Sequence, residues 1–195
     1  LAEDPKVVAI GECGLDYYKT TSDARQEAGK KQKEIFMKQI ELAKELKKPL
    51  VLHCRPSNES EDAYNDALVI LAACHMSLAA GNGVAHFFSG SKEIAKKFLD
   101  LGFYISFAGP ITFHPSGGHP KGGPSPYEEI VKFVPNNKIL VETDAPFAAP
   151  RPWRGERNEP VFVEFVARQI AQCKRFDFDK VAAETHNNAT SLFGI

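Results

Sequence analysis

The stretch Ile139-Leu-Val-Glu-Thr-Asp-Ala-Pro146 decides how the rest of the chain is interpreted. Its apolar start is typical of a strand that is buried on both faces, as in a parallel sheet covered by helices. Asp144 stands at the expected C-terminal end of this strand, where barrel and open α/β enzymes keep their chemistry. Taken alone, Asp144 is equally well explained as the cap of a turn before Pro146. Its role therefore depends on whether other strands end in the same way.

Strand-like and helix-like segments alternate along the whole chain. Apolar runs predict strands at 6–10, 50–53, 84–88, 103–107 and 139–144. Amphipathic patterns predict helices at 26–48, 61–80, 91–101, 125–133, from 160 onwards and at 179–192. This alternation is typical of βαβ units and a parallel sheet, either an open doubly wound sheet or a (β/α)8 barrel. No Gly-x-Gly-x-x-Gly turn follows a strand, which removes the best support for a dinucleotide-binding fold.

Bulk properties describe an ordinary globular chain. Its 195 residues are expected to form a single domain over 1–195. The net charge of −1 gives no global electrostatic case for nucleic acid. No apolar run reaches the roughly 20 residues that span a membrane, and no secretory signal opens the chain. The four cysteines form no Cys-x-x-Cys pair, which favours reduced thiols and a cytoplasmic location.

Metal-binding residue types stand at or just after four of the predicted strands: Glu12, His53, His86 and Asp144. The C-terminal ends of parallel strands lie on one rim, so these side chains are expected to converge. Two imidazoles and two carboxylates suit Zn²⁺, Mn²⁺ or similar ions, and paired ions serve phosphate ester hydrolysis. Each residue alone is more simply a hydrogen-bonded strand histidine or a loop charge. The four together favour a metal site, because buried charges are costly unless they are paired or metal-bound.

Several motifs then resemble one known family in the same order along the chain. They are Gly11-Glu-Cys-Gly-Leu-Asp-Tyr17, Leu52-His-Cys-Arg55, Val84-Ala-His-Phe-Phe-Ser-Gly90, Glu142-Thr-Asp-Ala-Pro146, Arg157-Asn-Glu-Pro160 and the tail Asn188-Ala-Thr-Ser-Leu-Phe193. Together they resemble the TatD-like metal-dependent hydrolases, also called the TatD DNase family. The resemblance implies an α/β fold of the TIM (β/α)8-barrel type and two divalent metal ions, with Mg, Mn and Zn not distinguished. It also implies hydrolysis of phosphodiester bonds, typically as a DNase or exonuclease acting on DNA.

The resemblance also implies roles for individual residues. Glu12 would bridge two ions, and His53 and His86 would hold the second of them. Asp144 would bind the first ion and act as the general base on the attacking water, or orient it.

Other residues are placed on the substrate side by the same resemblance. Arg157 and Asn158 fall in a substrate-side loop, and Arg55 follows a ligand directly, so these residues are predicted to bind substrate. An arginine there can fork onto a phosphate. Trp153 fits either stacking on a nucleobase or, slightly better, anchoring its loop.

The sequence departs from the family at its start. Members begin with a strand that carries His-x-His, followed by a second strand, and no His-x-His occurs here. We therefore expect an incomplete barrel without its first two strands. We also expect a chain that binds at most one ion tightly and has weak activity. Two alternatives stay open: a hydrolase of a small ester or amide, and a catalytically impaired barrel fragment with a binding role.

Overall fold

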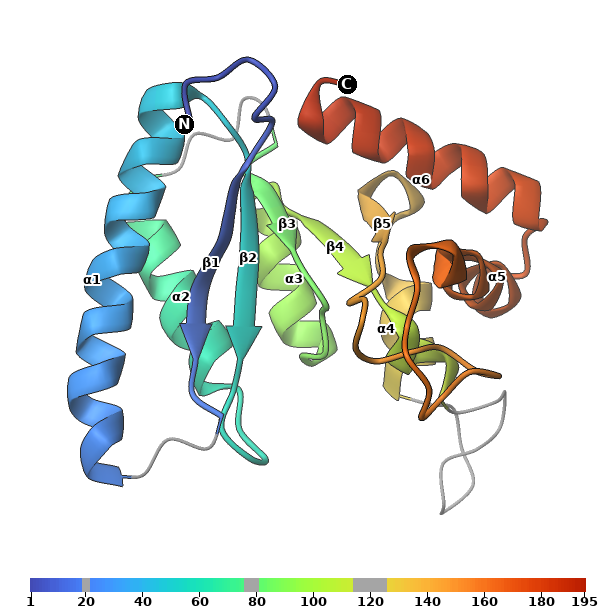
Figure 1. Cartoon of the computed structure of the whole chain (residues 1–195), viewed down its shortest axis with the longest axis horizontal. Helices are drawn as coiled ribbons and strands as arrows, with labels where there is room; N and C mark the ends of the chain where they lie inside the picture. The colour runs from blue at the N-terminus through green and yellow to red at the C-terminus, as the bar shows by residue number, and fades with distance from the viewer. Residues whose placement is uncertain (19–21, 76–80, 114–125) are drawn as a thin grey trace. The chain divides into compact units, whose positions relative to one another are not determined.

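The computed structural model describes residues 1–18, 22–75, 81–113 and 126–195 (Figure 1). These residues fall into two compact units, each of which is described by itself. The first unit comprises Leu1–His86, Lys96–Tyr104 and Ser191–Ile195, and the second comprises Phe87–Ala95 and Ile105–Thr190. The assignment of residues 1–195 to a single domain stays a prediction.

Strands and helices alternate as the sequence predicts. In order the elements are β1 (Ile10–Asp16), α1 (Ser22–Leu46), β2 (Leu50–Arg55), α2 (Asp62–Ala73), β3 (Gly83–Ala85), α3 (Lys92–Asp100), β4 (Tyr104–Phe107), α4 (Pro126–Phe133), β5 (Ile139–Val141), α5 (Val163–Lys174) and α6 (Phe178–Phe193). Short 3-10 helices occur at η2 (Gly109–Thr112), η3 (Asn136–Lys138) and η4 (Pro160–Phe162). The five described strands form a sheet in the order β1-β2-β3-β4-β5. The prediction of an α/β fold built on parallel strands is confirmed.

In the first unit, β2 pairs in parallel with both β1 and β3, and helices α1 and α2 lie beside these strands (Figure 1). Burial alternates along β2, because successive side chains of a strand point to opposite faces. Leu50 and Leu52 are fully buried, and Cys54 is 8% exposed. His53 lies between them in sequence and points to the other face, away from this part of the core. Because of this alternation, the His53 imidazole lies on the sheet face opposite the one occupied by Leu50 and Leu52.

Strand β1 starts where we predicted it to end. The apolar run at 6–10 predicted a strand, and the glycines of Gly11-Glu-Cys-Gly14 predicted a turn after it, but β1 begins at Ile10 and continues to Asp16. A Cβ atom at Gly14 would lie 2.0 Å from the carbonyl oxygen of His53, and one at Gly11 would lie 2.6 Å from the Cβ of Val51. The glycines thus allow β1 to approach β2 closely and do not end the strand. The register shifts between Ile10 and Cys13, as at a β-bulge.

Two further strands end earlier than predicted. The strand expected at 84–88 ends at Ala85, and Phe87 adopts a positive φ of 48° that extended backbone does not allow. The strand expected at 139–144 ends at Val141, so Asp144 lies beyond it. Among the helices, part of the prediction at 61–80 and the first residue of that at 125–133 lie outside the described residues.

In the second unit, β4 and β5 pair in parallel with Ile105 opposite Ile139. The last helix is tied to this pair by a buried amide. Asn188 of α6 is 7% exposed, and its Nδ2 donates to the carbonyl oxygens of Asn136 at 2.7 Å and Ile139 at 2.8 Å. Helix α6 thereby fixes the point at which β5 begins.

No helix among the described residues has both the length and the apolar character needed to cross a membrane.

Candidate metal centre

Three of the four predicted ligands come together in the first unit. The Nδ1 atom of His53 lies 2.6 Å from Oε1 of Glu12, and the Nε2 atom of His86 lies 3.6 Å from the same oxygen. Glu12 belongs to β1, His53 to β2, and His86 follows β3 directly. Residues 12, 53 and 86 are far apart in sequence, so the parallel strands produce the cluster.

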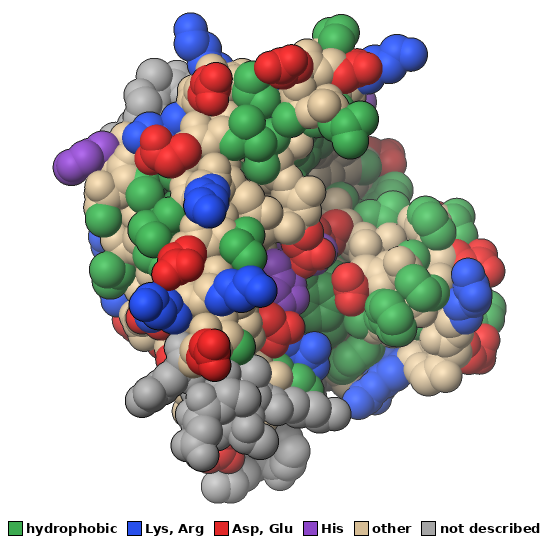
Figure 2. Space-filling model, turned by 60° about the vertical axis from the view of Figure 1, so that its left-hand side comes forward, with side chains coloured by type: hydrophobic (Ala, Val, Ile, Leu, Met, Phe, Trp, Pro, Cys, Tyr) green, Lys and Arg blue, Asp and Glu red, His purple; other side chains and the backbone are tan. Residues whose placement is uncertain are grey.

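The strand register explains the meeting of the two histidines. Leu52 pairs with Ala85, and the backbone N–H of His86 donates to the carbonyl of Leu52 at 2.9 Å. The next residues on the two strands, His53 and His86, are therefore neighbours. The cluster is open to solvent on one side, since the side chain of Glu12 is 49% exposed and that of His86 is 16% exposed. Figure 2 shows histidine and acidic side chains next to one another at the molecular surface.

The chemistry of this donor set fits a divalent ion. Two imidazole nitrogens and one carboxylate are ligands that Zn²⁺ and related ions use in proteins. As they stand, no three or more His, Cys, Asp or Glu side chains of the described residues have the spacing of a metal site. The 2.6 Å contact between Glu12 and His53 leaves no room for an ion between these two atoms. Ion binding there would replace a proton, as expected for ligands that must be deprotonated to coordinate.

A fourth side chain of the first unit, which the sequence analysis missed, joins the cluster. Oδ2 of Asp16 lies 3.2 Å from Nε2 of His53, so the imidazole stands between two carboxylates. Asp16 was missed because the strand was predicted to end at residue 10, six residues before it. With the strand extended to its real end, Asp16 pairs with Arg55 and lies beside His53.

The fourth predicted ligand belongs to the second unit. Asp144 lies beyond Val141, the last residue of β5, and is partly buried. Its backbone carbonyl accepts a hydrogen bond from the N–H of Phe147 at 2.6 Å. Its membership of the metal centre stays a prediction.

Glu142, which sequence reasoning also missed, has a defined partner within the second unit. Its Oε1 accepts the backbone N–H of Phe87 at 2.6 Å, in the turn where Phe87 has its positive φ. Phe87 directly follows His86 in the chain. Glu142 thus holds the backbone next to a candidate ligand. No local pattern in the sequence announces this contact between residues 55 positions apart.

The three predicted substrate-binding residues differ in their surroundings. The guanidinium of Arg55 is exposed and lies 3.9 Å from the ring centroid of Tyr18. Arg157 is exposed as well. Asn158 is only 2% exposed, and its Nδ2 donates to the carbonyl of Phe147 at 2.6 Å. These contacts give Asn158 a supporting role in the loop after β5.

The ring of Trp153 stacks on that of Phe162, with centroids 5.2 Å apart and an angle of 3° between the planes. This contact favours the loop-anchor interpretation.

The cysteines next to Glu12 and His53 are buried and remain thiols. Burial, and then the charge of Glu12, raises the pKa of Cys13 to about 12. Burial also raises the pKa of Cys54, with a further contribution from Cys13. Neither residue offers a thiolate at neutral pH, and both act as packing residues.

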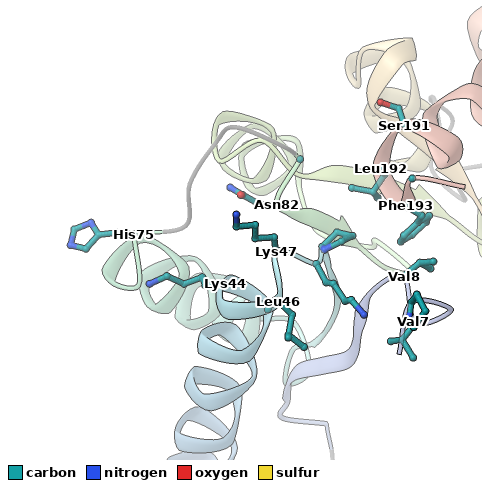
Figure 3. A pocket seen from close by; sticks show the side chains of 16 residues that line it. Val7, Val8, Lys44, Leu46, Lys47, His75, Asn82, Ser191, Leu192 and Phe193 are labelled. Carbon is teal, nitrogen blue, oxygen red and sulfur yellow. The ribbon is translucent and has the colours of Figure 1, made fainter. Parts of the chain in front are cut away.

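A cavity of the first unit lies at the opposite end of the strands. It has a volume of about 770 Å³ and is lined by residues that precede β1, β2 and β3 and by the C-terminal ends of α1 and α6 (Figure 3). Apolar side chains such as Val8, Leu46 and Phe193 line it together with lysines of α1 and the following turn. Among the described residues that line this cavity none carries a carboxylate, and Figure 3 shows the side chain of His75 pointing away from it. It is therefore distinct from the candidate metal centre.

Comparison with known proteins gives consistent similarities. A family model described as TatD related DNase matches residues 1–194. The chain is 43% identical over 197 residues to the uncharacterized metal-dependent hydrolase YabD of Bacillus subtilis, covering 100% of this chain and 68% of that protein. It is 38% identical over 195 residues to the uncharacterized metal-dependent hydrolase YcfH of Escherichia coli K12, covering 100% of this chain and 66% of that protein. It is 37% identical over 199 residues to the 3'-5' ssDNA/RNA exonuclease TatD of Erwinia amylovora, covering 100% of this chain and 69% of that protein.

Solved structures show the same fold. The TatD homologue YJJV of Escherichia coli superposes with a TM-score of 0.78 at 29% identity, covering 98% of this chain and 65% of that one. A TatD family hydrolase of Entamoeba histolytica superposes with a TM-score of 0.72 at 19% identity, covering 96% of this chain and 64% of that one. These similarities support the predicted fold class. The chain spans about two thirds of the length of the proteins it matches.

Proposed function

Because the chain belongs to the family of TatD-related DNases, we propose that it is a metal-dependent hydrolase that removes nucleotides from the ends of DNA strands. The observation that carries the proposal is the convergence of Glu12, His53 and His86 in the first unit. The names of its relatives support it, since those from Bacillus subtilis and Escherichia coli are named metal-dependent hydrolases and that from Erwinia amylovora is named a 3'-5' ssDNA/RNA exonuclease. The free cysteines fit a reducing compartment such as the cytoplasm.

The cluster of the first unit would hold the ion. His53 and His86 supply neutral nitrogen donors, and Glu12 supplies the carboxylate that both of them approach. A bound divalent ion lowers the pKa of water and neutralises charge on a phosphate. The partial exposure of Glu12 leaves one side of the cluster accessible to a phosphodiester.

Three further residues have separate tasks in the proposal. The guanidinium of Arg55 packs on the ring of Tyr18 at the C-terminal ends of β1 and β2. From this position it would donate hydrogen bonds to a phosphate oxygen of the substrate. Arg157 does the same from the exposed loop after β5. Asp144 accepts a proton from the attacking water, which is the work of a general base.

The test is an exonuclease assay with an end-labelled single-stranded oligodeoxynucleotide and added Mn²⁺, Mg²⁺ or Zn²⁺. Glu12→Gln is expected to abolish metal-stimulated cleavage, and Asp144→Asn to lower kcat by about 10²–10⁴-fold. His186→Ala is the matched control, because His186 is an exposed histidine of α6. Wild-type turnover by Glu12→Gln would refute the proposal.

Salt dependence separates DNA from a small substrate. Cleavage that depends on phosphate contacts is expected to weaken steeply between about 50 and 200 mM salt. Salt-insensitive hydrolysis of a small ester, without oligonucleotide cleavage, would instead support the small-ester alternative.

A further inference from the structure

We propose that Asp16 is a positioning residue that fixes the His53 ring so that Nδ1 is the nitrogen His53 offers to a divalent cation. The inference rests on the proposed function, because it concerns the same cluster. It adds a residue for which neither the motifs nor the relatives supply a role.

The contacts of His53 define the problem. Its Nδ1 lies 2.6 Å from Oε1 of Glu12, and its Nε2 lies 3.2 Å from Oδ2 of Asp16. A neutral imidazole carries one N–H and one lone pair, and an ionised carboxylate only accepts. The two carboxylates therefore compete for one proton of the neutral ring. If the N–H donates to one carboxylate, the ring nitrogen on the side of the other carboxylate carries the lone pair.

Asp16 is built into the structure as an acceptor. The side chain of Gln32 on α1 holds both backbone groups of Asp16: Oε1 accepts its N–H at 2.8 Å, and Nε2 donates to its carbonyl at 3.0 Å. The N–H of Tyr18 donates to Oδ1 of Asp16 at 2.9 Å. With Oδ1 engaged in this way, Oδ2 is turned toward His53. With its backbone held at two points and its Oδ1 at a third, Asp16 loses little additional freedom when Oδ2 accepts the imidazole N–H.

The shorter distance, 2.6 Å, is the one to Glu12, which indicates that the proton of the metal-free ring lies on the Nδ1 side. An ion that binds Nδ1 displaces this proton, and the ring then carries its N–H on Nε2. Asp16 stabilises this form, because its Oδ2 lies 3.2 Å from Nε2 and accepts that N–H. Without Asp16 the Nε2–H loses this acceptor, and coordination through Nε2 competes with coordination through Nδ1, the nitrogen beside the Glu12 oxygen that His53 and His86 both approach. Histidine ligands of metals are commonly oriented by a carboxylate acting on their other nitrogen.

The test measures the affinity of the metal-free chain for Zn²⁺ by competition with a chromogenic chelator. Asp16→Ala is expected to weaken Zn²⁺ binding by about 10–100-fold. Asp16→Asn keeps an oxygen that accepts the Nε2–H, so its affinity is expected to remain close to that of the wild type. Asp66→Asn is the matched control, because Asp66 is a hydrogen-bonded carboxylate of the same unit that accepts from Tyr17.

A second readout reports the ring itself. Proton–nitrogen correlation spectra of the Zn²⁺-loaded chain, with isotope-labelled histidine, are expected to show His53 protonated at Nε2 and coordinated through Nδ1. In Asp16→Ala this signature is expected to be lost or mixed with coordination through Nε2, and Asp16→Asn is expected to restore it. A role for Asp16 in folding alone would leave the signature of the bound ring unchanged.

The outcomes separate this inference from the proposed function. If Glu12→Gln removes Zn²⁺ binding while Asp16→Ala leaves both affinity and coordination unchanged, the positioning role is overturned and the proposed function stands. If the wild-type chain binds no Zn²⁺, the metal centre is overturned and the positioning role with it.

Discussion

Replacing Asn188 by alanine is expected to destabilise the second unit well beyond the effect of an ordinary helix substitution. The amide of Asn188 is 7% exposed, and its Nδ2 donates to two carbonyl oxygens, at 2.7 Å to Asn136 and at 2.8 Å to Ile139. These bonds join α6 to η3 and to the first residue of β5. The substitution removes the donor and leaves the carbonyls in place.

The magnitude follows from what happens to each carbonyl. A buried polar group that loses its partner costs about 1–3 kcal/mol. The carbonyl of Asn136 still accepts the N–H of Ile139, so the cost of losing the Asn188 donor there lies at the lower end of this range. We therefore expect the free energy of unfolding to fall by about 2–3 kcal/mol, less the few tenths that alanine gains in helix propensity. Asn188→Asp is expected to cost more, because a carboxylate would face two carbonyl oxygens.

Urea unfolding followed by circular dichroism measures this difference. Asn187→Ala is the matched control, because Asn187 is the adjacent residue of the same helix, has the same side chain and is exposed. The control cancels the change in helix propensity and is expected to lie within about 0.5 kcal/mol of the wild type. If Asn188→Ala lowers the free energy of unfolding by no more than Asn187→Ala does, the Asn188 amide does not stabilise the attachment of α6 to β5.

Three further substitutions test contacts elsewhere. Burial raises the pKa of Asp62, but hydrogen bonds led by that of Ser57 outweigh it and lower the net pKa. Ser57→Ala, which removes a 2.7 Å bond to this partly exposed carboxylate, is expected to cost about 1 kcal/mol at neutral pH. A folded-state pKa below the unfolded one stabilises above the unfolded pKa of about 3.9, so the difference should shrink as pH falls below it. Glu142→Ala removes the acceptor of a 2.6 Å backbone hydrogen bond and is expected to cost about 1–2 kcal/mol in urea unfolding, with Glu142→Gln near the wild type. Trp153→Ala is expected to lose about 0.5–1.5 kcal/mol of stacking on Phe162 in thermal unfolding and to leave KM for single-stranded DNA unchanged.

Each of these has a contradicting result. A pH-independent deficit in Ser57→Ala would separate its effect from the charge of Asp62. Equal losses in Glu142→Ala and Glu142→Gln would show that the backbone contact does not depend on an acceptor. A raised KM with unchanged stability in Trp153→Ala would favour the base-stacking interpretation.

Helices and most strands were predictable because their patterns are local. Apolar residues at three- and four-residue spacing (Ile35, Phe36, Ile40, Ala43 and Leu46) predicted the helix at 26–48. In α1, Phe36, Ile40 and Ala43 are buried, whereas Ile35 is 46% exposed. The apolar run at 50–53 likewise predicted a strand, and β2 is found there. These positions depend on periodicity, which a single segment carries by itself.

The start of β1 and two residues near the candidate ligands were not predictable in this way. Gly11 and Gly14 suggested a turn, but their function is to let β1 approach β2, which depends on the partner strand. Asp16 and Glu142 act through contacts with residues that are distant in sequence, at His53 and Phe87. Such partners cannot be identified from a local sequence pattern, because they depend on which strands pair and in which register.

The central claim is that Glu12, His53 and His86 hold a divalent ion. Its most direct test is to dialyse the chain against Zn²⁺ or Mn²⁺ and to count bound metal per chain, in the wild type and in His53→Ala and His86→Ala. The account predicts one tightly bound ion in the wild type and its loss in both variants, while His186→Ala retains it. Unchanged metal content in His53→Ala and His86→Ala, or a wild-type chain without bound metal, would contradict it.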